Sequence, residues 1–209
     1  MQKGGGCLKQ EEYYGNKFPL LKQGETYLKT LIETYPNSCA KDEFQAILYI
    51  KTRIKTPKSM IEKLRRHGMK EDSQTALQNI HDALGIRVIC SFVEDVYQIA
   101  RWLQERDEIQ IMEKKDYIAY PKPNGYRSLH LIIQFTTDDL EGITAEIQLR
   151  TIAIDFWAAL EHQIKYKHNV PHEEIIRSEL KRCADEIASV DLSMQTIRDI
   201  LQSDIWEQT

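Results

Sequence analysis

The residues best suited to chemistry in this sequence lie between Asp116 and His130, in the stretch DYIAYPKPNGYRSLH. Two prolines and a glycine in this stretch predict a loop, and the run that follows alternates like a β-strand. The alternation places Tyr126, Ser128 and His130 on one face of the strand, beside a loop that carries Lys122. An aromatic ring and an imidazole next to a lysine would suit a flat base with phosphates attached. A hairpin with a half-polar strand is the plainer interpretation, and this stretch alone leaves both open.

A cluster of positive charge precedes this stretch, because residues 51–70 contain eight Lys or Arg and one acid, Glu62. The cluster covers a predicted strand, residues 47–55, and the start of a predicted helix for which Thr56 is a suitable N-cap. A cationic strand that leads into a helix N-terminus predicts a polyphosphate site, although a solvated charged surface has the same composition. The candidate residues are Lys51, Arg53 and Lys55 on one strand face and Ser59, Lys63 and Arg66 on one helix face.

Two acidic residues are candidates for the centre of the site. Asp82 stands at the entrance of a predicted buried strand, residues 86–92, in which Arg87 is the charged exception. An acid at this place is often only a turn former. The second candidate, Glu146, points outward from the alternating stretch ITAEIQLR. It could instead be an exposed strand residue that pairs with a lysine.

The stretch that carries Glu146 also predicts how the candidates meet. A turn precedes residues 143–150, so we expect this strand to pair antiparallel with residues 126–135. Glu146 and Gln148 would then lie on the same sheet face as Tyr126 and His130.

The remaining patterns predict the elements around these strands. We expect helices over residues 19–35, 73–79 and 96–106, a strand over 108–118, and a helix that begins at Thr151. The last helix has a predicted core stripe and carries Asp155 on a neighbouring face; the stripe consists of Ala153, Trp157, Leu160 and Ile164. Together these elements predict an α+β fold in which helices flank a mixed β-sheet of about five strands.

The two ends of the chain differ from this central part, residues 19–169, which we expect to form one domain. Residues 1–18 are expected to be a loose tail, and residues 170–209 a helical extension. In the extension, apolar residues repeat at spacings of four and three, which is typical of a coiled-coil seam and favours contact with another subunit. The seam consists of Ile176, Leu180, Cys183, Ile187, Val190, Met194, Ile197 and Leu201.

Composition limits the class of protein. The 209 residues carry a formal net charge of −4, which argues against a general nucleic-acid coat. No apolar run reaches the ~20 residues of a membrane span, and the N-terminus lacks a signal-peptide core, so we expect a cytoplasmic protein without a membrane partner. Four scattered cysteines, without CxxC pairs, are expected to be reduced thiols; they are Cys7, Cys39, Cys90 and Cys183.

With these residues identified, the chain resembles the small alarmone synthetases, single-domain relatives of the RelA/SpoT synthetase domain. The matching stretches are RIKTPKSMIEKLRR, HDALGIRVICSF, DYIAYPKPNGYRSLH, AEIQLRT and FWAALEHQIKYK, in family order through residues 53–167. The resemblance implies a nucleotidyltransferase-like fold, a magnesium cofactor and a homotetramer. It also implies a (p)ppGpp synthetase, which transfers pyrophosphate from ATP to the 3′-hydroxyl of GDP or GTP.

The resemblance assigns roles to the candidates. Asp82 and Glu146 would bind magnesium, and Glu146 would also take the proton from the 3′-hydroxyl. In the ATP site, the adenine would lie between Arg53 and Arg87, and the phosphates would contact Lys55, Ser59, Lys63 and Arg66. In the GDP/GTP site, the guanine would stack on Tyr126 near Asp155, with Lys122 and His130 at the phosphates and Gln148 near Glu146.

Two other functions share some of these features. A toxic relative that pyrophosphorylates the tRNA 3′ end would need a basic surface, which a net charge of −4 disfavours. A non-catalytic nucleotide or RNA sensor would gain little from carboxylates beside phosphates. The residues Glu113, Lys114, Lys115 and Asp116 combine features of both motifs, RxKD and ExDD, that the long enzymes carry before the central loop. We therefore leave the choice between GDP and GTP open.

Overall fold

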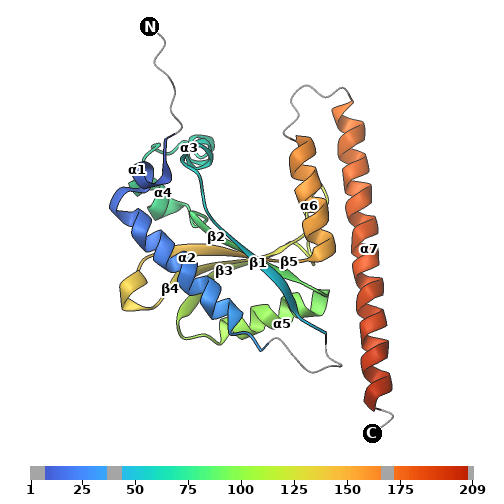
Figure 1. Ribbon diagram of the computed structural model, residues 1–209. Coiled ribbons are helices and arrows are strands. Elements are labelled where there is room, and N and C mark those ends of the chain that lie inside the picture. Colours follow the sequence, from blue (N-terminus) through green and yellow to red (C-terminus); the bar gives the residue numbers. More distant parts are fainter. Residues whose placement is uncertain (1–7, 37–43, 166–171, 207–209) are drawn as a thin grey trace.

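The computed structural model describes residues 8–36, 44–165 and 172–206 (Figure 1). Within them, a five-stranded sheet has the order β1-β2-β5-β4-β3. The strands are β1 Ile47–Ile54, β2 Leu84–Cys90, β3 Ile109–Asp116, β4 Leu129–Phe135 and β5 Thr144–Thr151. The central pair, β2 and β5, is parallel, and the other neighbours are antiparallel. The predicted mixed sheet and the predicted β4–β5 pairing are confirmed.

Helices surround this sheet. The α-helices are α1 Gln10–Tyr14, α2 Phe18–Glu33, α3 Pro57–Arg66, α4 Ser73–Asn79, α5 Val93–Gln104, α6 Ile152–Lys165 and α7 Glu173–Trp206, and the short 3-10 helices are η1 Gly15–Lys17 and η2 Asp138–Leu140. In Figure 1, α2 and α5 lie along the sheet, whereas α6 and α7 stand side by side at one end of it. The predicted α+β class with a long C-terminal helix is thus confirmed.

Strand alternation divides the sheet into an apolar face and a polar face. Ile86, Val88 and Ile147 are buried in the main core together with Leu28 of α2 and Ile99 of α5. Burying such side chains contributes about 1.5–3 kcal/mol each, so this face holds the domain together. The intervening residues of β2 and β5 point to the opposite face, where they are available for a site; they are Arg87, Glu146, Gln148 and Arg150.

The N-terminal segment differs from the predicted loose tail over residues 1–18. Residues 10–17 are helical, and Tyr14 is buried in the core. The Tyr14 hydroxyl donates a hydrogen bond of 2.9 Å to the carbonyl of Lys55, and Gln10 donates one of 2.6 Å to the carbonyl of Ile54. The prediction is therefore wrong for this stretch, because a large aromatic side chain packs there; residues 1–7 lie outside the described residues.

Two details of the predicted faces also differ. The alternation expected for residues 47–55 puts Leu48 on the face opposite the three cations, but Leu48 is exposed, because the β1–β2 register shifts between Ile47 and Tyr49. Along α6, Leu160 and Ile164 of the predicted core stripe are exposed. Trp157 of the predicted stripe is buried, and the buried face of α6 continues with Ile154, Asp155 and Ala158, because this helix packs between the sheet and α7.

The long helix α7 has two different halves. Its N-terminal half packs Leu180, Cys183 and Ile187 of the predicted seam against the domain. In its C-terminal half the rest of the seam is solvent-exposed, and buried polar residues, Asp191 and Arg198, face the domain instead. The exposed seam residues are Val190, Met194, Ile197 and Leu201. The predicted seam thus serves the domain itself over half its length.

Two further expectations concern thiols and membranes. Cys90 and Cys183 are free thiols, whereas Cys7 and Cys39 lie outside the described residues. Among the described helices, none is long and apolar enough to cross a membrane.

Candidate functional site

Asp82, in the turn before β2, forms the centre of a cationic pocket. Its carboxylate is paired with Lys55, which follows β1, and with Lys63 of α3 at 2.8 Å. Burial would raise the pKa of Asp82, but the two ammonium groups outweigh burial and hold the pKa below its ordinary value. The other carboxylate oxygen, Oδ1, is buried and has no hydrogen-bond partner among the described residues. Asp82 is therefore ionised and has one oxygen available to a ligand.

Glu146 occupies a comparable position on β5. Its Oε1 lies 2.9 Å from Nδ1 of His130, and its Oε2 accepts a hydrogen bond of 2.7 Å from Gln148. The β4–β5 register places His130 opposite Gln148, which confirms that these residues share a sheet face. Burial would raise the pKa of Glu146, but the His130 hydrogen bond and charge and the Gln148 hydrogen bond lower it to about 2. Glu146 is therefore an ionised acceptor throughout the neutral range.

The two acids lie in the same part of the sheet. Gly85, three residues after Asp82, is the partner of Glu146 in the parallel β2–β5 ladder. Lys63 forms an ion pair with Asp82, and its charge also lowers the pKa of Glu146. Electrostatic effects weaken with distance, so the Lys63 ammonium must lie close to both carboxylates. The two acids are therefore near each other.

Aromatic residues adjoin this acidic centre on the β4 side, in the segment 117–128, which we call the acceptor loop. The Tyr126 hydroxyl lies 2.9 Å from Nε2 of His130, and the rings of Tyr117 and His130 meet edge to face at 5.3 Å. The Lys122 ammonium lies 4.4 Å from the Tyr117 ring centre and 5.0 Å from that of Tyr126. Tyr126 and Ser128 precede β4 rather than belonging to it, but Tyr126 and His130 meet as expected.

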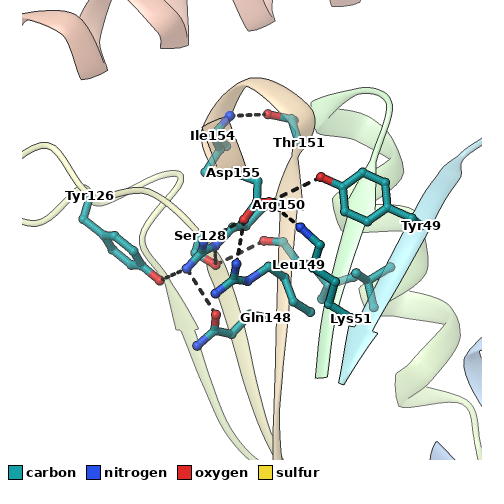
Figure 2. A network of polar contacts seen from close by, with 12 residues as sticks. Tyr49, Lys51, Tyr126, Ser128, Gln148, Leu149, Arg150, Thr151, Ile154 and Asp155 are labelled. Atoms are coloured by element: carbon teal, nitrogen blue, oxygen red, sulfur yellow. Dashed lines mark hydrogen bonds and ion pairs between the residues drawn. The ribbon is translucent and has the colours of Figure 1, made fainter. Parts of the chain in front are cut away.

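Arg150 connects this aromatic side of the site to the cationic side (Figure 2). It is buried, and its guanidinium donates hydrogen bonds to the Tyr126 hydroxyl at 2.7 Å and to Gln148 at 3.1 Å. On its other side it donates to Asp155 of α6 at 3.0 Å. Arg87 of β2 donates to the same Asp155 oxygen at 3.0 Å. One buried carboxylate therefore orients two arginines.

Asp155 also faces the β1 side of the sheet. Its second oxygen faces the Tyr49 hydroxyl at 3.4 Å and the Lys51 ammonium at 3.9 Å, both on β1. Figure 2 shows these two side chains on the opposite side of Asp155 from Tyr126. Asp155 thus contacts residues of β1 and β2 as well as Arg150, which bonds to Tyr126.

The remaining candidates lie around the cationic pocket. Thr56 caps α3 by accepting a hydrogen bond from the Ser59 backbone at 3.3 Å, as the sequence predicts. The Ser59 and Arg66 side chains are exposed, and Arg66 contacts only the Glu62 carbonyl, at 3.4 Å, among the contacts of the described residues. Arg53 is exposed on β1 opposite Gly85. These side chains surround the pocket without closing it.

Sequence reasoning did not identify three residues of the site: Tyr49, Tyr117 and Arg150. Tyr117 stands inside the central stretch, and the alternation of β5 already points Arg150 to the polar face. A signal therefore existed for both. For Tyr49 no signal existed, because its contact with Asp155 joins residues 106 positions apart.

The site fits a divalent metal ion that is held mainly by its substrate. Among the described residues, no group of three or more His, Cys, Asp or Glu could hold an ion. Magnesium, however, is usually bound through one or two carboxylates together with substrate phosphates and water. Asp82 has a buried oxygen that no described residue hydrogen-bonds, and Glu146 is ionised nearby. A donor set of two carboxylates suits magnesium, which prefers oxygen ligands.

Comparison with known proteins assigns this geometry to a family. Residues 52–171 match the family described as a region found in RelA / SpoT proteins. The GTP pyrophosphokinase YwaC of Bacillus subtilis is 43% identical over 155 residues, which cover 73% of this chain and 74% of that protein.

Solved structures give the same result. Small alarmone synthetase 2 from Bacillus subtilis superposes with a TM-score of 0.76 at 38% identity, over 88% of this chain and 98% of that one. Small alarmone synthetase 1 from the same organism, bound to its product pppGpp, gives a TM-score of 0.76 at 30% identity, over 86% and 93% of the two chains.

Proposed function

Because this chain belongs to the RelA/SpoT family, we propose that it is a (p)ppGpp synthetase that transfers pyrophosphate from ATP to the 3′-hydroxyl of GDP or GTP. One observation carries the proposal: two ionised carboxylates lie in one part of the sheet, Asp82 paired with Lys55 and Lys63, and Glu146 bonded to His130 beside the tyrosines of the acceptor loop. The relatives named above, a GTP pyrophosphokinase and a synthetase with bound pppGpp, support the same reaction.

In the proposed reaction, ATP binds at the cationic pocket. Lys55 and Lys63, which neutralise Asp82 in this structure, would turn to the phosphates, with Ser59 and Arg66 at the rim. Arg53 and Arg87 on the adjoining strands would hold the adenine. Ammonium groups placed on phosphates before reaction stabilise the charge that develops on the transferring group.

The acceptor nucleotide binds on the other side of the acids. Its guanine would stack on Tyr126, with Lys122 and His130 at its phosphates and Gln148 fixing Glu146. Glu146 would accept the hydrogen bond of the 3′-hydroxyl and take its proton as oxygen attacks the β-phosphorus. The bond between that phosphorus and the α-phosphate oxygen breaks, and AMP leaves.

Magnesium would be held by Asp82 and Glu146 together with the ATP phosphates. When bound, it neutralises charge on the transferring pyrophosphate and orients it. The two lysines that pair with Asp82 could turn to the phosphates, whose negative charge they would partly neutralise.

We also propose a homo-oligomer, the homotetramer that the family resemblance implies. The exposed C-terminal half of α7 supports this, because it presents a row of apolar residues to solvent. Val190 is 56% exposed, Met194 48%, Ile197 50% and Leu201 48%. A second copy of this chain would bury them. Because the proposed substrates are ATP and guanine nucleotides, the proposed location is the cytoplasm.

The test is to incubate the purified protein with magnesium, ATP and GDP or GTP, and to separate the products by anion-exchange chromatography. The expected products are AMP and guanosine tetra- or pentaphosphate in equal amounts. Competition between GDP and GTP in one reaction then gives the preferred acceptor. Label transferred from ATP to tRNA, with neither guanosine product formed, would refute the proposal.

A further inference from the structure

We infer that α7 is a positioning element of the acceptor site. Its N-terminal half forms the support against which the acceptor loop lies, so the position of α7 determines the affinity for the acceptor nucleotide. This inference rests on the proposed function for the identity of that nucleotide. It assigns to α7 a role within the catalytic domain, besides the subunit contact expected from its sequence.

The first observation is a close approach of two backbones. Gly125, at the turn of the acceptor loop, has φ +88°, a conformation that favours glycine. A Cβ atom at this residue would lie 2.7 Å from Cβ of Ala184 and 3.3 Å from Cα of Lys181, both on α7. The loop therefore lies directly on the helix, where Gly125 has no Cβ and Ala184 has only a methyl group.

The second observation is a small apolar cluster that includes the stacking residue itself. Trp157 and Ala158 of α6 and Ala184 of α7 are buried together, and Tyr126 packs against them. The Trp157 indole donates a hydrogen bond of 2.8 Å to the Leu180 carbonyl, which fixes α7 against α6. The Tyr126 hydroxyl thus contacts His130 and Arg150, and the Tyr126 side chain packs against α6 and α7.

Polar contacts hold the same loop at two further points. Arg127 donates to the Ile118 carbonyl at 3.1 Å within the loop and to Asp185 of α7 at 3.2 Å. The side-chain amide of Asn124 donates to Glu161 of α6 at 3.3 Å, and its Oδ1 accepts a hydrogen bond of 3.3 Å from the Tyr126 backbone N–H. The loop is therefore tied to both helices on either side of Tyr126.

The helix itself is anchored independently of the loop. Thr151, at the end of β5, donates a hydrogen bond of 2.6 Å to the buried carboxylate of Asp191. Further along, Arg198 pairs with Asp95 of α5 at 2.6 Å, and both side chains are buried. Because these anchors connect α7 to the rigid sheet and to α5, the helix provides a fixed surface, and the loop takes its position from it.

The ATP site has no comparable contact with α7 among the described residues. Lys55 follows β1, Lys63 belongs to α3 and Asp82 precedes β2, and the two strands pack against each other and against α2. Displacing α7 should therefore weaken acceptor binding and leave ATP binding nearly unchanged. That asymmetry distinguishes positioning from general loss of structure.

The test compares Ala184→Val with Ser189→Val, which makes the same kind of substitution at an exposed position of the same helix. The added methyl groups of the first variant meet the Gly125 backbone, and misplacement of a binding group by about 1 Å costs up to ~100-fold. We expect the KM for GDP to rise roughly tenfold, the KM for ATP to stay within about twofold, and amide exchange in residues 117–128 to accelerate. Ser189→Val should change none of these.

A second pair of variants covers the case in which Ala184→Val fails to fold. Gly125→Ala should weaken GDP binding, and adding Ala184→Gly should restore part of it, because the 2.7 Å contact is then removed while the φ strain stays. An absence of rescue, or equal rises in the KM for ATP and for GDP, would overturn the inference. If the wild-type protein has no synthetase activity, the proposed function fails; calorimetric GDP binding and amide exchange still test the positioning role.

Discussion

Replacing Asp155 by asparagine removes the carboxylate that Arg87 and Arg150 share. The change keeps the shape of the side chain and one acceptor oxygen, so it alters charge while leaving the packing of α6 intact. Asp155 is 7% exposed and Arg150 5% exposed as side chains, whereas Arg87 is 28% exposed. The variant therefore isolates the contribution of one buried anion.

The loss in the free energy of unfolding depends on whether Arg87 and Arg150 can reach water when Asp155 is replaced. Removing one partner of a buried ion pair costs about 3–5 kcal/mol, because the other charge stays buried without compensation. Arg87 can turn towards solvent, and Arg150 keeps its bonds to Tyr126, Gln148 and Ser128. We therefore expect the lower end, a loss of about 3 kcal/mol in the free energy of unfolding. In a chain of this length that loss corresponds to a fall in Tm of about 6–12 °C.

The assay is chemical and thermal unfolding at one protein concentration, because association would shift the apparent stability. Asp139→Asn, at an exposed position of η2, is the matched control. The hydrogen bonds around Asp155 reach Tyr126 of the proposed GDP site, through Arg150, and Arg87 of the proposed ATP site. The KM values for GDP and ATP should therefore both rise. If Asp155→Asn is as stable as the control to within about 0.5 kcal/mol, the ion-pair reasoning is refuted.

Further predictions concern the acids, the metal and α7. Glu146→Gln should lower kcat at least ~100-fold in the synthetase assay with little change in nucleotide binding, and Glu141→Gln, an exposed control, should not. The depressed pKa of Glu146 contributes stability above its ordinary value of 4.5, and this contribution is lost as pH falls towards about 2. The unfolding free energies of wild type and Glu146→Gln, measured by denaturant titration, should therefore converge across that window. A chelator should abolish turnover in the same assay, and added magnesium should restore it. Ile197→Glu should reduce the oligomer mass measured by light scattering, and an unchanged mass would contradict contact through this face.

Strand alternation and helix-capping rules are sufficient to predict several polar residues of the site from the sequence. Alternation in residues 143–150 predicts the outward Glu146 and its antiparallel partner strand, and the Thr56 cap is readable from a few neighbouring residues. These signals are local, and the side chains concerned need no distant partner to acquire their direction. The predictions from these local signals therefore agree with the structure.

Contacts between elements far apart in the sequence could not be predicted in this way. The pairing of Asp155 with Arg87 and Tyr49 depends on how α6 lies across the sheet, and no local pattern encodes that angle. The seam of α7 shows the same limit. Its 4-3 spacing predicts a helix with an apolar stripe but does not say that Ala184 meets the acceptor loop while Ile197 faces solvent.

The parallel pairing of β2 with β5 has a consequence for how the enzyme is made. The two strands are adjacent in the middle of the sheet, yet β5 is synthesised about 60 residues after β2, and such distant pairings form late in folding. A growing chain that ends before β5 already contains Asp82 with Lys55 and Lys63, but it has neither Glu146 nor Arg150. A chain truncated before β5 would therefore carry the proposed phosphate-binding lysines without the second carboxylate of the site.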